Sequence, residues 1–237
     1  MPEFEVRAGA SGYSYKPWKG SFYPETLPDA DMLRYYAERL PAVEINNTFY
    51  RMPKASVLSG WAEKTPAGFR FAIKASRRIT HMQRLRDAED STAYLFETLG
   101  ALGDKLGPVL FQLPPYLKKD LALLRDFLAT VPRERRATME FRSRSWFDDD
   151  VFQALRDHGV ALCIGESGDE SKDAPPVATA EWGYLRLRRD DYGDADLAGW
   201  ADRIRDQGWR DAYVFFKHED KGVAPKLAQR LMALVAG

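Results

Sequence analysis

Short apolar stretches alternate with amphipathic stretches along most of the chain. Eight apolar stretches have the length and composition of β-strands, and seven segments between or after them carry the hydrophobic spacing of helices. The predicted strands are residues 4–10, 42–46, 69–75, 109–113, 136–141, 160–164, 184–187 and 212–216. The predicted helices are residues 29–40, 54–64, 91–106, 120–131, 147–158, 194–207 and 222–235. Residues 165–182 interrupt this rhythm, because they are rich in Gly, Ser, Asp and Pro and lack helical periodicity.

This order of elements predicts a single domain over residues 1–237 with the (β/α)8 architecture of a TIM barrel. A loop is expected in place of the helix after the sixth strand. An open, doubly wound parallel sheet is the competing architecture. No strand is followed by the Gly-rich turn GxGxxG or GxxxxGK, which weighs against the nucleotide-binding versions of that sheet. We therefore predict the barrel, and we predict no resident cofactor.

Polar residues gather on one face of the predicted strands, at their carboxyl ends. Residues 138–146 (TMEFRSRSW) show the pattern best, because alternation places Glu140 and Arg142 on one face and Met139 and Phe141 on the other. A charged pair inside a covered strand is costly unless it is paired or used. The same parity brings a set of polar residues to the barrel mouth, where active sites of such barrels lie. This set is Glu44, Asn46, Lys74, Gln112, Arg186, Arg188 and either Lys217 or His218.

The predicted mouth has more cations than carboxylates, which suits a phosphate or carboxylate group. Arg142 and Arg186 are expected to bind this group, because a guanidinium offers a planar, bidentate fork. Lys74 would stabilise developing charge, and Glu140 or His81 would move the proton. Glu44 would orient the cations or act as the base. The remaining predicted ligand contacts are Gln112, Asn46, Tyr50, Tyr13, Trp146, Lys217 and His218. The competing interpretation is an internal salt-bridge network that only holds the barrel closed.

A metal site is not predicted, although Glu44, His81 and Glu140 carry suitable ligand atoms. Lys74 and Arg142 would repel a divalent ion, and the sequence has no HxxxH or HxH spacing.

The first long loop, residues 13–28, interleaves aromatic residues with Lys16 and Lys19. Such a loop can stack on a base or a sugar ring. The alternative interpretation, which we favour slightly, is an apolar plug at the barrel mouth. Together with Arg188 and Arg189, this loop is the basis for considering nucleic acid as a partner.

Composition narrows the choice of partner. The 237 residues contain 35 Lys+Arg and 35 Asp+Glu, so net charge gives no global case for nucleic acid or for an acidic membrane surface. The single cysteine, Cys163, excludes an internal disulfide framework and is expected to be a buried thiol. We find neither a signal peptide nor an apolar run of about 18 residues, so we expect a cytoplasmic protein without a membrane partner.

Several motifs in fixed order resemble those of the YecE-like family, also called domain of unknown function seventy-two. They include residues 12–13 and 18–24, 43–50 (VEINNTFY), 69–74 with 80–81, 106–115 (LGPVLFQLPP) and 140–146 (EFRSRSW). The resemblance covers nearly the whole chain and implies a TIM-barrel-like fold but no established activity. It marks Glu44, Asn46, Tyr50, Lys74, His81, Gln112, Glu140, Arg142 and Trp146.

Two stretches differ from the usual form of that family. Residues 186–189 (RLRR) stand where Arg-Leu-His-Gly is common, and Lys217 with His218 stands where an Asn pair is common. Both differences add positive potential. A mechanism that needs the histidine after the seventh strand would require His218 to replace it.

Three hypotheses for function follow. The first is a hydrolase, lyase or isomerase acting on a small phosphorylated or carboxylated substrate. The second is a non-catalytic barrel that binds a ligand or nucleic acid, and the third is a metal-dependent phosphoesterase or sugar isomerase. We favour a small anionic ligand over nucleic acid. The sequence specifies neither the substrate nor the oligomeric state.

Overall fold

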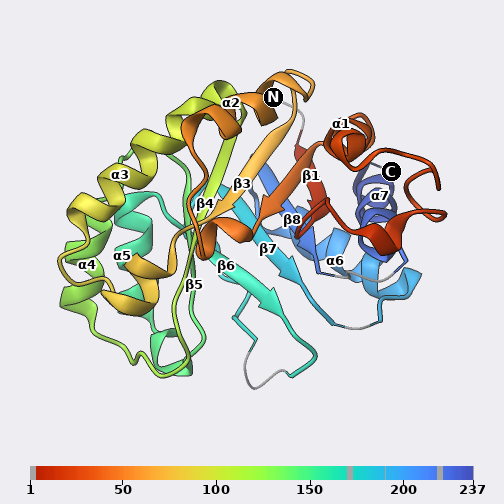
Figure 1. The fold of residues 1–237 in the computed structure, drawn as a ribbon. Helices are drawn as coiled ribbons and strands as arrows, with labels where there is room; N and C mark the ends of the chain where they lie inside the picture. Colours follow the sequence, from red (N-terminus) through yellow and green to blue (C-terminus); the bar gives the residue numbers. More distant parts are fainter. Residues whose placement is uncertain (1–3, 170–172, 190, 218–220, 237) are drawn as a thin grey trace.

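The computed structural model describes residues 4–169, 173–189, 191–217 and 221–236. Eight parallel strands form a closed barrel in chain order, and β1 pairs with β8 (Figure 1). The strands are β1 (Glu5–Ala10), β2 (Ala42–Ile45), β3 (Arg70–Lys74), β4 (Leu106–Gln112), β5 (Ala137–Glu140), β6 (Ala161–Glu166), β7 (Trp182–Leu187) and β8 (Asp211–Phe216). The predicted (β/α)8 fold is confirmed.

In the described part of the chain, seven α-helices alternate with the strands on the outside of the barrel (Figure 1). They are α1 (Met32–Ala37), α2 (Ala55–Glu63), α3 (Glu89–Leu99), α4 (Leu121–Ala129), α5 (Asp149–His158), α6 (Asp194–Asp206) and α7 (Val223–Ala236). The described residues between β6 and β7 contain no helix, as expected. The predicted helix 91–106 was wrong at its C-terminal end. The α-helix ends at Leu99, and a 3-10 segment, Gly100–Lys105, follows it, with Gly103 in non-helical torsions.

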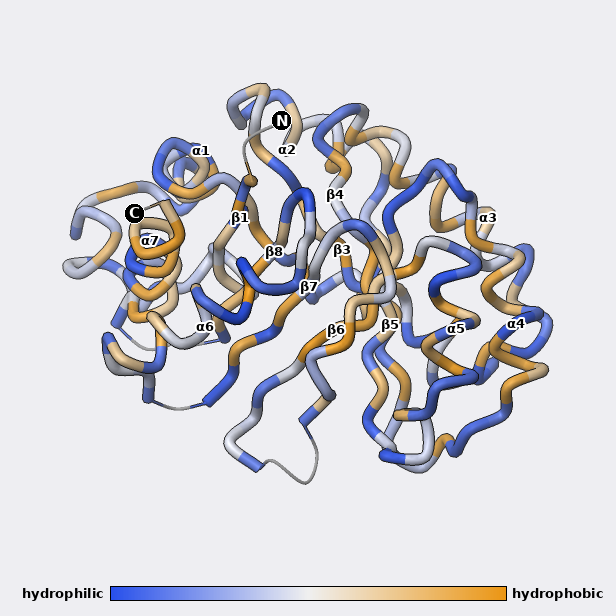
Figure 2. The backbone as a smooth tube through the Cα atoms, turned by 180° about the vertical axis from the view of Figure 1, so that it is seen from behind, coloured by the Kyte–Doolittle hydropathy of each residue, from blue (hydrophilic) through white to orange (hydrophobic). Residues whose placement is uncertain are grey.

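Alternation along the strands separates two apolar layers. Nine buried residues form a cluster of their own: Ala42, Ala72, Leu110, Ala161, Cys163, Trp182, Tyr184, Tyr213 and Phe215. The opposite parity, including Val43, Ile73, Phe111 and Met139, belongs to the larger core shared with the helices. The strands are mainly hydrophobic in colour, whereas the loops at their ends are largely hydrophilic (Figure 2). Because both faces of the strands are buried, the polar side chains that could bind a ligand gather at the strand ends.

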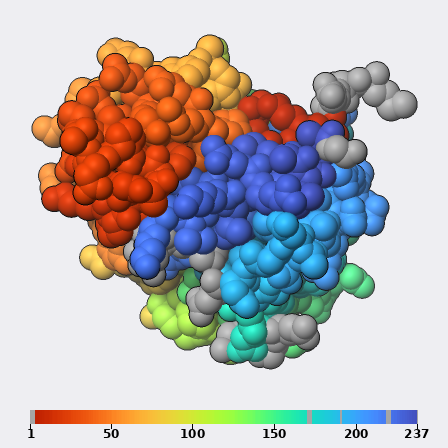
Figure 3. Space-filling view, turned by 90° about the vertical axis from the view of Figure 1, so that its right-hand side faces the viewer, coloured from red at the N-terminus to blue at the C-terminus, as the bar shows by residue number. Residues whose placement is uncertain are grey.

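The aromatic loop before α1 packs into the protein. Trp18 is 0% exposed and Tyr23 is 2% exposed, and their rings stack at 5.9 Å between centroids. The Phe22 ring lies edge-on to both Tyr35 and Tyr36 of α1. Figure 3 shows this N-terminal part of the chain lying beside the C-terminal helices. These rings stabilise the fold and are not available to stack on a base.

The Tyr36 hydroxyl joins α1 to the start of the barrel. It accepts a hydrogen bond from Ala10 N at 2.7 Å and donates one to Ala42 O at 2.9 Å. Gly9 lies beside this junction, and a Cβ atom placed there would lie 2.0 Å from Ala42 O and 2.8 Å from the Tyr36 hydroxyl. The close approach of β1 and β2 therefore requires glycine at this position.

We predict that Gly9→Ala lowers the free energy of unfolding by at least about 2 kcal/mol, because backbone atoms must move to admit the methyl group. Urea unfolding followed by circular dichroism measures the effect. Gly60→Ala is the matched control, since a Cβ atom there meets nothing within 4 Å. In the helix α2 this control should gain about 0.5–1 kcal/mol. Equal behaviour of the two variants would contradict the packing argument.

Candidate functional site

A buried ion triad crosses the barrel at the carboxyl ends of its strands. Arg186 of β7 donates from one terminal nitrogen to Glu140 Oε2 at 2.6 Å and from the other to Glu44 Oε1 at 2.9 Å. The side chains of Arg186 and Glu140 are each 4% exposed, and that of Glu44 is 0% exposed. A guanidinium bonded to two carboxylates removes most of the cost of burying these charges.

Glu44 is held by four donors. Besides Arg186, it accepts hydrogen bonds from the Tyr184 hydroxyl at 2.6 Å, the Ser11 hydroxyl at 2.8 Å and Asn46 Nδ2 at 3.0 Å. Burial alone would raise the pKa of Glu44, but the Arg186 charge and these hydrogen bonds outweigh it and lower the pKa. Burial and the neighbouring Glu44 charge raise the pKa of Tyr184 well above its ordinary value, so this hydroxyl keeps its proton.

Glu140 also accepts four hydrogen bonds. Gln112 Nε2 donates to Oε2 at 2.8 Å alongside Arg186, while Arg142 Nε at 3.3 Å and Arg188 at 3.1 Å share Oε1. Burial would raise the pKa of Glu140, but the charges of Arg186, Arg188 and Arg142 lower it far below the usual glutamate range. Glu140 is therefore a fixed anion that positions arginines. It is poorly suited to the proton transfer that the sequence suggested for it.

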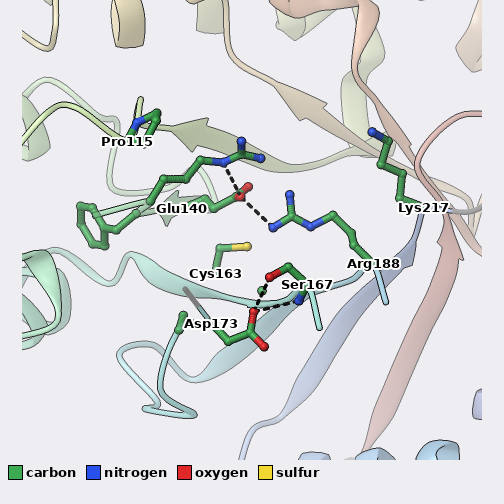
Figure 4. A pocket seen from close by; sticks show the side chains of 11 residues that line it. Pro115, Glu140, Cys163, Ser167, Asp173, Arg188 and Lys217 are labelled. Carbon is green, nitrogen blue, oxygen red and sulfur yellow. Dashed lines mark hydrogen bonds and ion pairs between the residues drawn. The ribbon is translucent and has the colours of Figure 1, made fainter. Parts of the chain in front are cut away.

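A cavity of about 520 Å³ opens above Glu140. Its lining includes Glu140, Arg142, Cys163, Arg188 and Lys217. Arg188 reaches towards Glu140 in Figure 4, and Pro115 and Lys217 stand on opposite sides. Cys163 is fully buried, and burial raises the pKa of its thiol well above its ordinary value. It is therefore an uncharged part of the cavity lining.

Arg142 and Arg188 present unused donors near this cavity. Arg142 uses only Nε in its bond to Glu140, and its side chain is 40% exposed. The Arg188 side chain is 19% exposed, and its buried Nε has no hydrogen-bond partner in the described part of the chain. Gly165 makes room for Arg188, because a Cβ atom there would lie 3.1 Å from its terminal nitrogen. The cavity thus combines spare N–H donors with fixed positive charge.

Lys74 and His81 flank the cluster on the side of β3. The Lys74 ammonium donates to Gln112 Oε1 at 3.0 Å and lies 4.2 Å from the centre of the Phe49 ring. Burial and the Arg186 charge lower the pKa of Lys74 to about 8. The His81 ring packs against Phe49 at 4.9 Å, and burial and the Lys74 charge lower its pKa. The shift brings the pKa of Lys74 nearer to neutral pH than that of an ordinary lysine, and it favours the neutral form of His81.

The structure separates the remaining predicted ligand contacts. Lys217 continues the inward parity of Tyr213 and Phe215 and lines the cavity. Tyr13 lines a different cavity of about 250 Å³, together with Asn46. The placement of Trp146 at the mouth was wrong, because its ring is 0% exposed and stacks on Phe141 at 5.0 Å. Its indole N–H donates to Leu117 O, so Trp146 belongs to the core between barrel and helices.

Two further residues predicted to contact the ligand are not part of the cluster that the structure describes. Tyr50 is 72% exposed and lies on the surface beside the mouth. His218 lies outside the described residues.

Sequence reasoning missed Tyr184 and Ser11, which complete the Glu44 site, and it gave Arg188 only a secondary place. The signal for Tyr184 was available, because it shares the parity of Arg186 and Arg188 along β7. Ser11 follows β1 and carries no charge, so its sequence position alone gave no reason to select it. Arg186 was expected to contact the ligand, but both of its terminal nitrogens are engaged by carboxylates.

Metal ligands do not converge in the described ranges. No group of three His, Cys, Asp or Glu side chains there could hold a metal ion, and Arg186 stands between Glu44 and Glu140. Among the same residues, no helix combines the length and apolarity that crossing a bilayer requires.

Fold and cluster together define a (β/α)8 barrel with a polar, charged site at the carboxyl ends of its strands. The chain belongs to the family described as Protein of unknown function DUF72, whose model matches residues 7–237. The resemblance seen in the sequence is therefore confirmed.

Relatives support this assignment. UPF0759 protein YunF of Bacillus subtilis is 30% identical over 260 residues, which cover 91% of this chain and 90% of YunF. UPF0759 protein YecE of Escherichia coli is 32% identical over 141 residues, covering 57% of this chain and 52% of YecE. A DUF72 family protein of Thermotoga maritima has a similar solved structure, with a TM-score of 0.85 and 24% identity. That match covers 98% of this chain and 100% of the Thermotoga chain, and it supports the fold alone.

We predict that Arg186→Met lowers the free energy of unfolding by about 3–5 kcal/mol at neutral pH, because two buried carboxylates lose their shared cation. Urea unfolding measures the loss. The triple variant Arg186→Met, Glu44→Gln, Glu140→Gln should recover part of this stability, since it leaves no buried carboxylate without a cation. If the single variant were as stable as the parent, the triad would not constrain the fold.

Proposed function

We propose that the barrel binds a small phosphorylated or carboxylated molecule in the cavity above Glu140. The observation that carries this proposal is the pairing of Arg142 and Arg188 on one carboxylate oxygen, with spare donors beside a cavity of about 520 Å³. Lys217 adds a third cation to the lining. A volume of this size is typical of small-molecule sites.

Arg186 has an indirect part in this proposal. It fixes Glu44 and Glu140, and Glu140 in turn fixes the two outer arginines. The mouth holds two carboxylates, Glu44 and Glu140, and Asp173 also lines the cavity. Five cations outnumber them: Arg142, Arg186, Arg188, Lys74 and Lys217. The cluster therefore keeps an excess of positive charge in a protein of zero formal net charge. An anionic ligand would complete the balance.

Turnover is the finer part of the proposal, by hydrolase, lyase or isomerase chemistry. Lys74 and His81 are the groups suited to proton transfer, because burial and the Arg186 charge lower the pKa of Lys74 to about 8 and the imidazole of His81 can accept or donate a proton. Glu140 supplies fixed electrostatics. The same cavity without turnover would serve as a ligand-binding site, so binding is the first property to test.

We predict that inorganic phosphate or a sugar phosphate binds the parent protein and binds Arg142→Ala and Arg188→Ala at least about tenfold more weakly. Each substitution removes charge-assisted hydrogen bonds to the anion. Isothermal titration calorimetry at low salt measures the affinities.

Arg125→Ala is the matched control, because Arg125 is an exposed arginine on the helix α4. Its affinity should equal that of the parent. Unchanged affinity in both cavity variants would remove the proposed site, and incubation with a panel of sugar phosphates and carboxylates would separate turnover from binding alone.

We also predict that sulfate affinity falls as the pH rises through about 8. The charged form of Lys74 attracts the anion, and this form is populated below its pKa and lost above it. Sulfate does not titrate in this range, so the step reports on the protein. Titrations between about pH 7 and 9.5 should show the step in the parent and not in Lys74→Met. A step of the same size in both proteins would assign it to another group.

A further inference from the structure

A second group of cations lies beside the mouth, on the loops that follow β2 and β3. These residues, called here the rim cations, are Arg51, Lys54, Arg77, Arg78 and Arg84. All five are exposed. None has a carboxylate within 4.0 Å among the described residues. Many arginines elsewhere have such partners: Arg7, Arg34, Arg39, Arg136, Arg142, Arg186, Arg188, Arg189, Arg205, Arg210 and Arg230.

The rim also carries exposed aromatic rings. Tyr50 is 72% exposed and Tyr116 is 57% exposed, whereas most aromatic residues of this protein are buried. The Arg77 guanidinium lies 5.9 Å from the centre of the Tyr50 ring, and the Arg84 guanidinium lies 5.4 Å from the Tyr116 ring. Each pair offers a π-face and a positive charge at the same place. Met82, which is 69% exposed, adds apolar surface.

The backbone holds this loop in an unusual conformation. Arg84, Leu85 and Asp87 have positive φ values of 54°, 69° and 47°. Residues other than glycine rarely adopt this region, and such torsions persist where the surroundings enforce them. The buried Leu85 side chain and hydrogen bonds from Leu85 N to Ile79 O and from Gln83 Nε2 to Asp87 O enforce them here. The strained turn leaves the Arg84 side chain exposed.

Acidic residues begin where the basic loop ends. Residues 74–86 contain Lys or Arg at five positions and no Asp or Glu. Asp87, Glu89 and Asp90 follow at the start of α3, and the nearby Arg86 has Asp120 at 3.7 Å. The rim is thus a local patch within a neutral chain. The segment between β3 and α3 lies at the same end of the barrel as the carboxyl ends of the strands (Figure 1).

We propose that this rim binds single-stranded nucleic acid, with the rim cations on phosphates and with Tyr50 and Tyr116 stacked on bases. Arginines without carboxylate partners suit a phosphate backbone, because no internal ion pair must be broken. Exposed rings suit unpaired bases, since stacking needs a free π-face and is tolerant of sequence. A duplex is a poorer partner, because its bases are stacked inside the helix and cannot stack on the tyrosines. An acidic peptide is also a poorer partner, because it has no bases to stack on Tyr50 and Tyr116.

The test uses the full chain and a fluorescently labelled single-stranded oligonucleotide of about 12 nucleotides, as RNA and as DNA. Fluorescence anisotropy at about 50 mM salt should show binding that weakens steeply as salt rises. Arg77→Ala with Arg84→Ala should weaken binding by at least tenfold and flatten the salt dependence. Tyr50→Ala with Tyr116→Ala should weaken binding by about tenfold and leave the salt slope unchanged.

Two controls separate the rim from other cations. Arg210→Ala removes an exposed arginine at the amino end of β8, at the opposite end of the barrel, and should bind as the parent does. Arg188→Ala should lose phosphate affinity and keep oligonucleotide affinity, so failure of the cavity and failure of the rim are distinguishable. Circular dichroism checks that each variant is folded.

Three results would overturn the proposal. The first is no binding at low salt, and the second is equal affinity of parent and rim variants. The third is equal or tighter binding of a duplex of the same sequence, which would remove the stacking role of the tyrosines. Vesicles of anionic phospholipid provide the competing partner. If they bound through the same residues while the oligonucleotide did not, the rim would be a membrane-contact surface.

Discussion

The position of Arg186 between Glu44 and Glu140 constrains the whole mouth of the barrel. Three charges are buried there, and each is acceptable only because the other two are in place. Each oxygen of the two carboxylates also accepts a hydrogen bond from a hydroxyl, a side-chain amide or an outer arginine. Strands β2, β5 and β7, which are far apart in sequence, are thus joined through one guanidinium. A change at any of the three residues is felt at all of them.

The charged residues of the mouth fall into two groups with different roles. The inner charges hold the geometry, and the outer ones face the cavity. Glu140 stands at the boundary, since one of its oxygens faces Arg186 and the other faces Arg142 and Arg188. A low pKa suits this position, because protonation of Glu140 would release both outer arginines. For the turnover that we propose, the groups left to transfer a proton are therefore Lys74 and His81, which lie beside the triad and not within it.

The order of strands and helices was sufficient to predict the fold, and alternation along the strands predicted most of the residues that meet at the mouth. It placed Glu44, Glu140 and Arg186 together because carboxyl ends of barrel strands converge. An internal salt-bridge network was the competing interpretation of these charges, but alternation could not predict that Arg186 binds carboxylates with both terminal nitrogens, since side-chain pairing depends on neighbours from other strands. The prediction that Trp146 lies at the mouth was wrong for a related reason. After β5 the chain enters a short 3-10 turn, Arg144–Trp146, where strand parity no longer applies.

The cavity and the rim differ in one physical respect, and this difference argues for two kinds of contact. In the cavity each arginine already has a carboxylate partner, so a ligand adds to an existing, rigid network and the geometry is selective. At the rim Arg77 and Arg84 have aromatic partners and, among the described residues, no carboxylate within 4.0 Å, so an anion meets exposed charges beside π-faces. Rigid pairing favours a small ligand of fixed shape. Unpaired charge next to exposed rings favours a flexible polyanion with planar groups. Lys74 links the two regions, because its ammonium donates to Gln112, the amide partner of Glu140, while the rim cations Arg77 and Arg78 follow it in the chain.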